Sequence, residues 1–401
     1  MIERDEQILP VSDEDYLSLR HFVVTGTDYE IGRNLAELGR SDYGVTLQRY
    51  LDPVYARARA DYFEALWPAM ADRMRGVADG FGVDVYTTDL DPSCLKYDLG
   101  GSGCSAVFIP PSLSANGHPM VGRNYDYYAC TFSELVGRSP RPGELPSNKR
   151  SYALEVRPDD GHAFLGLSGA DLLNPWLDGI NDTGLFITAL DDPDAPGSPL
   201  ITWGGGRDSG LSQAQAPSLL LQTCATVDDA KLALLRHRIF APTSGLHFLI
   251  ADAQGAATVF EIDHDTGESV FTDAAHDAPF IVTNHPLHKY PTRDTFPEFE
   301  PSAEHNTFNR VCMLTDAAAR HAGKFTRDDL QALIDRVACA FVDQKAAQIG
   351  VPSAPERTLW THTTDLATKE IVATFYLGDT EPIAGTNHMG TRRSAPVTLA
   401  L

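Results

Sequence analysis

The pattern of apolar residues along the sequence changes at Cys104, and this change constrains the possible folds more than any other feature. Before it, residues from roughly 45 to 80 carry apolar side chains at helical spacing, which predicts a helix packed against the core. After it, short apolar segments follow one another between Gly, Asn or Pro turns. The first of these are CSAVFIP, HPMVGRNYDY, SYALEVRP, AFLGLSG and GLFITAL. Consecutive strands of this kind indicate an antiparallel sheet.

The second half of the chain adds helices and further strands. Two helices are predicted by capping pairs, Thr226 with Asp229 and Thr326 with Asp329. Between them lie the strands LHFLIADA, ATVFEID and FIVTNHP, and the end of the chain returns to strand with TLWTHTT and EIVATFYLG. This order along the chain, in which strands are followed by helices and then by strands again, is expected when two stacked sheets are covered by helices on both outer faces.

The amino-acid composition limits the classes of protein to which this chain can belong. A hydrophobic fraction of 43% over 401 residues is ample for a large core. The six cysteines, at 94, 104, 130, 224, 312 and 339, are too widely spaced for a metal cluster and form no Cys-x-x-Cys pair. The chain starts without an apolar signal segment and has no run of about 18 apolar residues that would span a membrane. We therefore expect a cytoplasmic protein with free thiols and no cofactor.

The charge excludes one class of partner. The chain carries 32 Lys and Arg against 55 Asp and Glu, a formal net charge of −23. Binding to nucleic acid needs basic patches, and none is evident. The acidic balance instead gives a mild bias toward neutral or cationic amine substrates.

The glycine-rich segment before Cys104 suggests a special role for this thiol. Three glycines in four positions, in Gly100-Gly101-Ser102-Gly103, let a nucleophile approach the Gly103 carbonyl without a side chain in the way. A buried structural cysteine, which is the common case, needs no such turn. If the chain is cut between Gly103 and Cys104, the new α-amine has a reference pKa of about 7.7 to 8.0 and can accept the thiol proton.

A second strand, about twenty residues on, ends in charged residues. It reads Gly122-Arg123-Asn124-Tyr125-Asp126-Tyr127 and is expected to pair with the Cys104 strand. Asp126 would then hydrogen-bond and orient the α-amine, and Arg123 would stabilise a thiolate or a substrate carboxylate. The plain alternative is a surface ion pair at the end of a hairpin, worth about 0 to 1 kcal/mol.

These segments resemble a known family. GCSAVF followed by NGHPMVGRNYDY is similar to the cysteine Ntn (N-terminal nucleophile) hydrolases, which include choloylglycine hydrolase, penicillin V acylase and acyl-CoA:6-aminopenicillanate acyltransferase. Three later segments fit the same pattern, namely INDTGL at 180–185, VTNHP at 282–286 and NTFNR at 306–310. The long segment before Cys104, with GTDYEIGR at 26–33, favours the acyltransferase group, whose precursors cut themselves at a Gly-Cys bond.

The resemblance implies a fold and a domain organisation. The expected fold is α+β, the αββα sandwich of Ntn hydrolases, in which two stacked antiparallel sheets are covered by helices. Residues 1–103 are expected to form a helical propeptide that stays associated after the cut, and residues 104–401 to form the catalytic domain. Gly103 and Cys104 would be the autoprocessing pair.

The resemblance also assigns three further candidate catalytic residues. Asn284 ends an apolar strand, and its side-chain N–H is expected to point at the developing oxyanion. Asn181 is expected to act in catalysis as well. A turn-forming role is the alternative for both asparagines, and this alternative is stronger for Asn181 than for Asn284. Arg310 is expected to orient Asp126 or the substrate, with a helix-surface arginine as the alternative.

We therefore expect a self-processing amidohydrolase or acyltransferase that acts on a linear carboxamide through an acyl-thioester on Cys104. Water as the second nucleophile gives a hydrolase and an amine gives a transferase, including an acyl-CoA-dependent N-acyltransferase. The sequence leaves these open. The expected partners are a small-molecule amide or acyl donor and the cleaved N-terminal fragment, with a homo-oligomer allowed and no membrane contact. A non-catalytic binding module on the same fold is the alternative from another class.

Three other site chemistries receive little support. A papain-like Cys-His pair would use His118 or His285, but no signature of those proteases surrounds Cys104. A metal site at His285 and His288 has no clear third ligand. The glycine-rich loop from Trp203 to Arg207 lacks the Gly-Lys-Ser/Thr ending of a phosphate-binding loop, so a rim loop is expected there.

Overall fold

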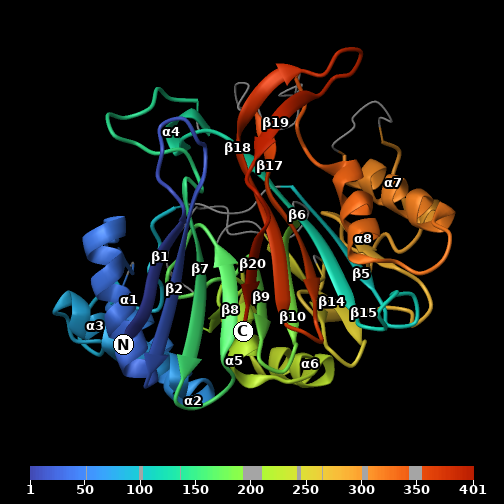
Figure 1. Ribbon diagram of the computed structural model, residues 1–401. Helices are drawn as coiled ribbons and strands as arrows, with labels where there is room; N and C mark the ends of the chain where they lie inside the picture. The colour runs from blue at the N-terminus through green and yellow to red at the C-terminus, as the bar shows by residue number, and fades with distance from the viewer. Residues whose placement is uncertain are drawn as a thin grey trace.

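The expected strands assemble into two large sheets in the computed structural model (Figure 1). The structure describes residues 1–50, 52–98, 103–135, 137–192, 210–241, 245–263, 265–299, 306–342 and 355–401. Over these residues, a nine-stranded sheet has the order β1 (Ile2–Leu9), β2 (Ser18–Gly26), β7 (Arg150–Pro158), β8 (Phe164–Ser168), β9 (Asp178–Asn181), β10 (Phe186–Asp192), β13 (Gly245–Ala251), β14 (Ala257–Ile262) and β15 (Ser269–Asp273).

The second large sheet carries Cys104. Within the described residues it has seven strands, in the order β16 (Phe280–Val282), β5 (Cys104–Ile109), β6 (Met120–Tyr128), β17 (Glu356–Asp365), β18 (Glu370–Pro382) and β19 (Met389–Arg393), with β20 (Val397–Ala400) also paired to β18. Two small sheets pair β3 (Gln48–Arg49) with β4 (Leu90–Asp91), and β11 (Leu211–Ser212) with β12 (Ile239–Phe240). The neighbours in the large sheets are antiparallel as predicted, apart from β2 and β7, which run parallel.

Helices cover both sheets. The helices are α1 (Asp28–Leu38), α2 (Pro53–Leu66), α3 (Pro68–Phe81), α4 (Phe132–Leu135), α5 (Ala216–Thr223), α6 (Val227–Arg236), α7 (Thr307–Arg320) and α8 (Arg327–Ile334), with short turns at Gly39–Tyr43, Arg293–Thr295 and Asp335–Val337. Helices α1, α5 and α6 contact the nine-stranded sheet, whereas α7 and α8 contact the seven-stranded sheet. Strands β5 and β10 meet between the two sheets. The expected αββα arrangement is confirmed.

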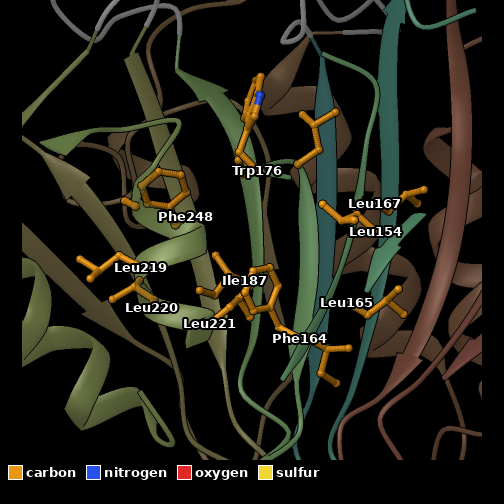
Figure 2. Close-up of a cluster of buried hydrophobic side chains, with 14 of the residues drawn as sticks. Leu154, Phe164, Leu165, Leu167, Trp176, Ile187, Leu219, Leu220, Leu221 and Phe248 are labelled. Atoms are coloured by element: carbon orange, nitrogen blue, oxygen red, sulfur yellow. The ribbon is translucent and has the colours of Figure 1, made fainter. Parts of the chain in front are cut away.

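Apolar side chains fill the spaces between these layers. Figure 2 shows the leucines of α5 against Ile187 and Phe164 of the nine-stranded sheet. A second cluster lies between the seven-stranded sheet and α7 and α8, and Val107 and Ile109 of β5 belong to it. Cys104, Ala106 and Phe108 point the other way, into the main core, because successive side chains of a strand face opposite sides. The alternation of β5 therefore places the Cys104 thiol between the two sheets.

The N-terminal segment holds more than the expected helix. The predicted stretch is divided into α2 and α3, because Pro68 disfavours helical geometry at the preceding Trp67, whose φ and ψ are −147° and 74°. In addition, β1 and β2 form one edge of the nine-stranded sheet. Most side chains of β1 are exposed, which is why the segment lacks the apolar alternation of a strand.

Several local expectations can be compared directly with the structure. The capping boxes at Thr226 and Thr326 are both present and begin α6 and α8. All six cysteines lie in the described part of the chain, and no disulfide joins them. Among the described residues, no helix is both long enough and apolar enough to cross a membrane. The glycine-rich loop at 203–207 lies outside the described residues.

Candidate active site

Cys104 is the first residue of β5 and is almost completely buried. Strand β5 pairs with β6 in the register that sets Cys104 opposite Tyr125, as the predicted hairpin requires. Arg123 and Asp126 therefore flank the position of the thiol along β6. Their approach to Cys104 follows from the antiparallel pairing of two strands that are consecutive in the sequence.

The Arg123 guanidinium is directed at the thiol. Its Nη2 lies 2.9 Å from Cys104 Sγ and donates to the Ala189 carbonyl at 2.7 Å, while Nη1 donates to the Asn124 carbonyl at 2.5 Å. Its Nε donates to Asp178 Oδ1 at 3.2 Å. The arginine is fully buried. Three oxygen acceptors thus fix the guanidinium, and one nitrogen faces the sulfur.

Asp178 balances the charge of Arg123 inside the protein. It is also buried, and it accepts hydrogen bonds from Thr188 Oγ1 at 2.7 Å and Trp360 Nε1 at 2.8 Å. Burial by itself would raise the pKa of the Asp178 carboxyl, but the Arg123 charge, His362 and the hydrogen bond from Thr188 together lower it below its usual value. A buried arginine is costly without such a partner. Sequence reasoning missed Asp178, although an aspartate at the start of a buried strand was a possible signal.

The thiol is held in its neutral form in the uncut chain. Burial raises the pKa of Cys104 to about 11, and the Arg123 guanidinium opposes this shift. The main-chain N–H of Asp191 donates to the sulfur and also opposes it. A thiol is a weak nucleophile compared with its thiolate. Reaction therefore requires a base that removes the proton.

Both sides of the Gly103–Cys104 peptide bond are held by the site. The Gly103 carbonyl accepts a hydrogen bond from the Asp126 main-chain N–H at 2.9 Å. The Cys104 N–H donates to Asn284 Oδ1 at 2.7 Å. The carbonyl of Cys104 in turn accepts from Arg310 Nη1. The peptide bond predicted to be cut is thus oriented by three of the predicted site residues.

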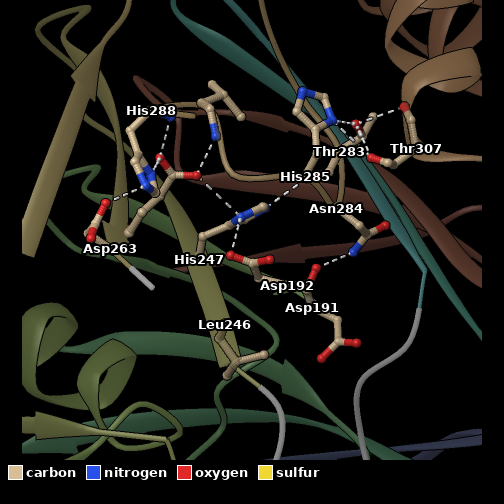
Figure 3. Close-up of polar contacts among 12 residues, drawn as sticks. Asp191, Asp192, Leu246, His247, Asp263, Thr283, Asn284, His285, His288 and Thr307 are labelled. Atoms are coloured by element: carbon tan, nitrogen blue, oxygen red, sulfur yellow. Dashed lines mark hydrogen bonds and ion pairs between the residues drawn. The ribbon is translucent and has the colours of Figure 1, made fainter. Parts of the chain in front are cut away.

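Arg310 and Asn284 hold each other in place. Arg310 lies in the first turn of α7 and donates from Nη2 to Asn284 Oδ1 at 2.7 Å and from Nη1 to Ser105 Oγ at 2.8 Å. Asn284 Nδ2 donates to the Asp191 carbonyl at 2.5 Å (Figure 3). The amide nitrogen has two hydrogens, and this bond uses one of them. The alternative of a helix-surface arginine is excluded for Arg310, because the residue is buried.

The Asp126 carboxylate is fixed by a residue distant in sequence. Thr358 Oγ1 accepts from the Cys339 N–H at 2.6 Å, so its own hydrogen points at Asp126 Oδ1, 2.5 Å away. A register shift between Thr358 and Trp360 interrupts the pairing of β17 with β6 at this point. Such bulges re-aim side chains next to active sites. Asp126 is buried, which excludes the alternative of a surface ion pair.

The side chain of Asn181 makes its described hydrogen bonds to main-chain and hydroxyl groups of two neighbouring segments and not to Cys104. Its Nδ2 donates to the carbonyls of Leu221 and Cys224 at 2.9 and 2.7 Å. Its Oδ1 accepts from the main-chain N–H groups of Thr183 and Leu185 at 3.1 and 2.9 Å. These bonds tie the turn after β9 to the end of α5. These contacts support the turn role that the sequence also allowed for Asn181.

The two histidines considered for a Cys-His pair have other contacts. His285 stacks on Phe308 with ring centroids 4.7 Å apart, and burial lowers its pKa to about 3. His118 pairs with Asp365 at 3.0 Å. His288 lies between the carboxylates of Glu261 and Asp263. None of these contacts involves Cys104, so the geometry does not support a papain-like pair.

A known protein family matches the middle of the chain. The sequence model of the acyl-coenzyme A:6-aminopenicillanic acid acyl-transferase family matches residues 113–305. The resemblance to this family is confirmed. The matched range includes Arg123, Asp126 and Asn284, whereas Cys104 and Arg310 lie outside it. The assignment of these last two residues therefore rests on their own contacts. No curated protein sequence matches the chain.

Solved structures provide more distant likenesses. A variant of conjugated bile acid hydrolase from Clostridium perfringens is 15% identical, with a TM-score of 0.43 over 74% of this chain and 97% of that one. Penicillin V acylase from Agrobacterium tumefaciens is 17% identical, with a TM-score of 0.42 over 71% of this chain and 84% of that one.

The raised thiol pKa predicts how uncut chains react with iodoacetamide. The tryptic peptide of residues 97–123 spans the cut site, comes only from uncut chains and has Cys104 as its single cysteine. Because the thiol pKa is about 11, its alkylation rate should rise about tenfold per pH unit between about pH 7 and 9. Native alkylation followed by mass spectrometry measures this rate. A plateau near pH 8 would contradict the prediction, and the peptide that begins at Cys104 in cut chains serves as the internal comparison.

Proposed function

We propose that this protein is a self-processing cysteine Ntn enzyme that cleaves or transfers the acyl group of a linear amide through an acyl-thioester on Cys104. The observation that carries the proposal is the group of contacts around one residue. Arg123 Nη2 faces the Cys104 sulfur at 2.9 Å, and Asn284 Oδ1 accepts from the Cys104 nitrogen at 2.7 Å. A nucleophile and the nitrogen that becomes its base are thus held together.

Maturation would proceed by an N-to-S shift. The Cys104 sulfur attacks the Gly103 carbonyl carbon, and the proton of the thiol passes to the departing nitrogen as the C–N bond breaks. Water then cleaves the thioester, which leaves a Gly103 carboxylate and the free α-amine and thiol of Cys104. The Asp126 N–H, 2.9 Å from the Gly103 oxygen, supports this step because it would stabilise the negative charge that develops there.

The two fragments would remain associated after the cut. Strand β2 pairs in parallel with β7 along nine residue positions from Ser18 with Arg150 to Gly26 with Pro158. These strands lie on opposite sides of the cut in sequence. Helix α1 also contacts both strands. Separation would expose this buried sheet edge and its apolar contacts to water, at a cost in free energy.

The mature site would then act on an external amide. The α-amine, with a reference pKa of about 7.7 to 8.0, accepts the thiol proton, and the sulfur attacks the substrate carbonyl. Water releases the acid, or an amine takes the acyl group. We favour hydrolysis of a linear amide, because the contacts described for the site include no recognisable binding site for a phosphorylated acyl carrier. Transfer from an acyl-CoA to an amine is the alternative that the matched family suggests.

An acyl adduct on Cys104 tests the proposal. A chromogenic amide of a small hydrophobic acid should acylate the mature fragment, and mass spectrometry after acid quenching should show the added mass on Cys104. Added amine then separates the two reactions. Higher total turnover with a new amide product identifies a transferase, whereas free acid at every amine concentration identifies a hydrolase. If no adduct forms with a broad panel of amides and thioesters, the protein is better explained as a binding module.

A further inference from the structure

A buried polar cluster lies beside the active site on the nine-stranded sheet. It is built on His247 of β13 and Glu261 of β14, which are both fully buried. Figure 3 shows His247 between Asp192 and the segment that carries Thr283 and Asn284. Their described contacts include the segment 283–288, which carries Asn284, and Asp192, and none of them is to Cys104. A buried carboxylate is costly unless it is paired and hydrogen-bonded. The groups that it binds therefore indicate what the cluster does.

The cluster holds the main chain on both sides of Asn284. Before Asn284, the Thr283 carbonyl lies 2.7 Å from His247 Nε2. A carbonyl only accepts, so this nitrogen carries the hydrogen. After Asn284, Glu261 Oε1 accepts from the Leu287 N–H at 2.6 Å and Oε2 accepts from the His288 N–H at 2.9 Å. Hydrogen bonds to a charged acceptor are stronger than neutral ones.

His247 also reaches the other segment that holds Asn284. Its Nδ1 lies 3.9 Å from Asp192 Oδ2 and 3.7 Å from Glu261 Oε1. Asp192 follows Asp191, whose carbonyl accepts from Asn284 Nδ2 at 2.5 Å. The imidazole is thus in contact with the segments on either side of the asparagine side chain. The cluster therefore sets the position of Asn284 relative to the Cys104 strand.

We propose that Glu261 and His247 are positioning residues that hold Asn284 in its catalytic geometry, so that turnover depends on two side chains that do not touch the reacting atoms. The inference rests on the proposed function of Asn284. Misplacement of a catalytic group by about 1 Å can cost about 10²-fold in rate. Loss of the anchors should therefore lower kcat while it leaves substrate binding nearly unchanged.

The kinetic test uses Glu261→Gln, which keeps the size of the side chain but replaces one acceptor oxygen with an amide nitrogen that cannot accept from a main-chain N–H. We expect kcat to fall by about 10- to 100-fold and KM to change by less than about twofold. Glu261→Asp keeps both oxygens and should recover part of kcat. Asp263→Asn is the matched control, because Asp263 contacts the outer nitrogen of His288 at 3.0 Å and none of the three main-chain anchors.

An activity-independent measurement accompanies the kinetics. Amide hydrogen exchange at Leu287 and His288 should be faster in Glu261→Gln than in the wild type, and unchanged in Asp263→Asn. Unaltered exchange, full kcat in Glu261→Gln, or an equal loss in Asp263→Asn would each overturn the proposal. If the wild type forms no acyl adduct, the proposed function fails, but the exchange data still decide whether Glu261 holds the segment.

Discussion

Cys104→Ala is expected to remain a single chain of 401 residues, while the wild-type protein resolves into fragments of residues 1–103 and 104–401. The physical reason is that the variant lacks the sulfur that would attack the Gly103 carbonyl, although the other groups around the scissile bond are present. Its fold should be retained, since the side chain shrinks by one sulfur atom. Intact mass spectrometry of both purified proteins provides the measurement.

A second buried cysteine supplies the control for this experiment. Cys224 lies at the end of α5, where its carbonyl binds Asn181, and its thiol has no part in the proposed chemistry. Cys224→Ala should therefore mature like the wild type. An efficiently cut Cys104→Ala protein would assign the cleavage to another protease and end the self-processing proposal. Native gel filtration should show the two wild-type fragments eluting together, because β2 pairs with β7.

Asn284→Ala is expected to lower kcat by about 10²–10³-fold, the effect of removing one donor to an oxyanion. The variant also removes the acceptor that holds the Cys104 nitrogen at 2.7 Å, so maturation should slow. For this reason the fraction of cut chains is measured first by mass, and kcat is then expressed per cut chain. KM should change much less than kcat if the interaction belongs to the transition state.

Asn181→Ala is the matched control, because it removes another buried asparagine that has only structural contacts in the described site. Its side chain bridges the turn after β9 and the carbonyls at the end of α5. The variant should lose about 1–3 kcal/mol of unfolding free energy and keep the kcat of the folded enzyme. The reverse pattern, with normal turnover in Asn284→Ala and a large loss in Asn181→Ala, would exchange the roles assigned to the two residues.

Local patterns in the sequence were enough to find the centre of the site. Cys104, Arg123 and Asp126 lie on two strands that follow one another in the sequence, and consecutive strands usually lie side by side in a sheet. The capping pairs at Thr226 and Thr326 predicted the starts of two helices for the same reason, since each cap is formed within four residues. The break between α2 and α3 also has a local cause in the sequence, because it lies at Pro68.

Other parts of the site depend on contacts that no local pattern contains. Asp178 approaches Arg123 from the opposite sheet, and Thr358 reaches Asp126 from a strand more than two hundred residues away. Motif-based reasoning listed both Asn181 and Asn284 as candidate catalytic residues, with the stronger turn alternative for Asn181. Only their surroundings separate them, since one binds the end of α5 and the other binds the Cys104 nitrogen.

The sequence by itself therefore predicted many of the strands after Cys104, the two capped helices and Cys104 as the candidate nucleophile, because these predictions depend on residues that are neighbours along the chain. The tertiary structure alone decided that the first hundred residues complete the sheet through β1 and β2. It also decided that Asp178 compensates the charge of Arg123, that the Thr358 hydroxyl binds Asp126, and that His247 and Glu261 contact the segment around Asn284. A buried charge needs a partner, and the packing of the two sheets decides which residue that partner is. The distance between two such residues along the sequence does not predict whether they meet in the folded protein.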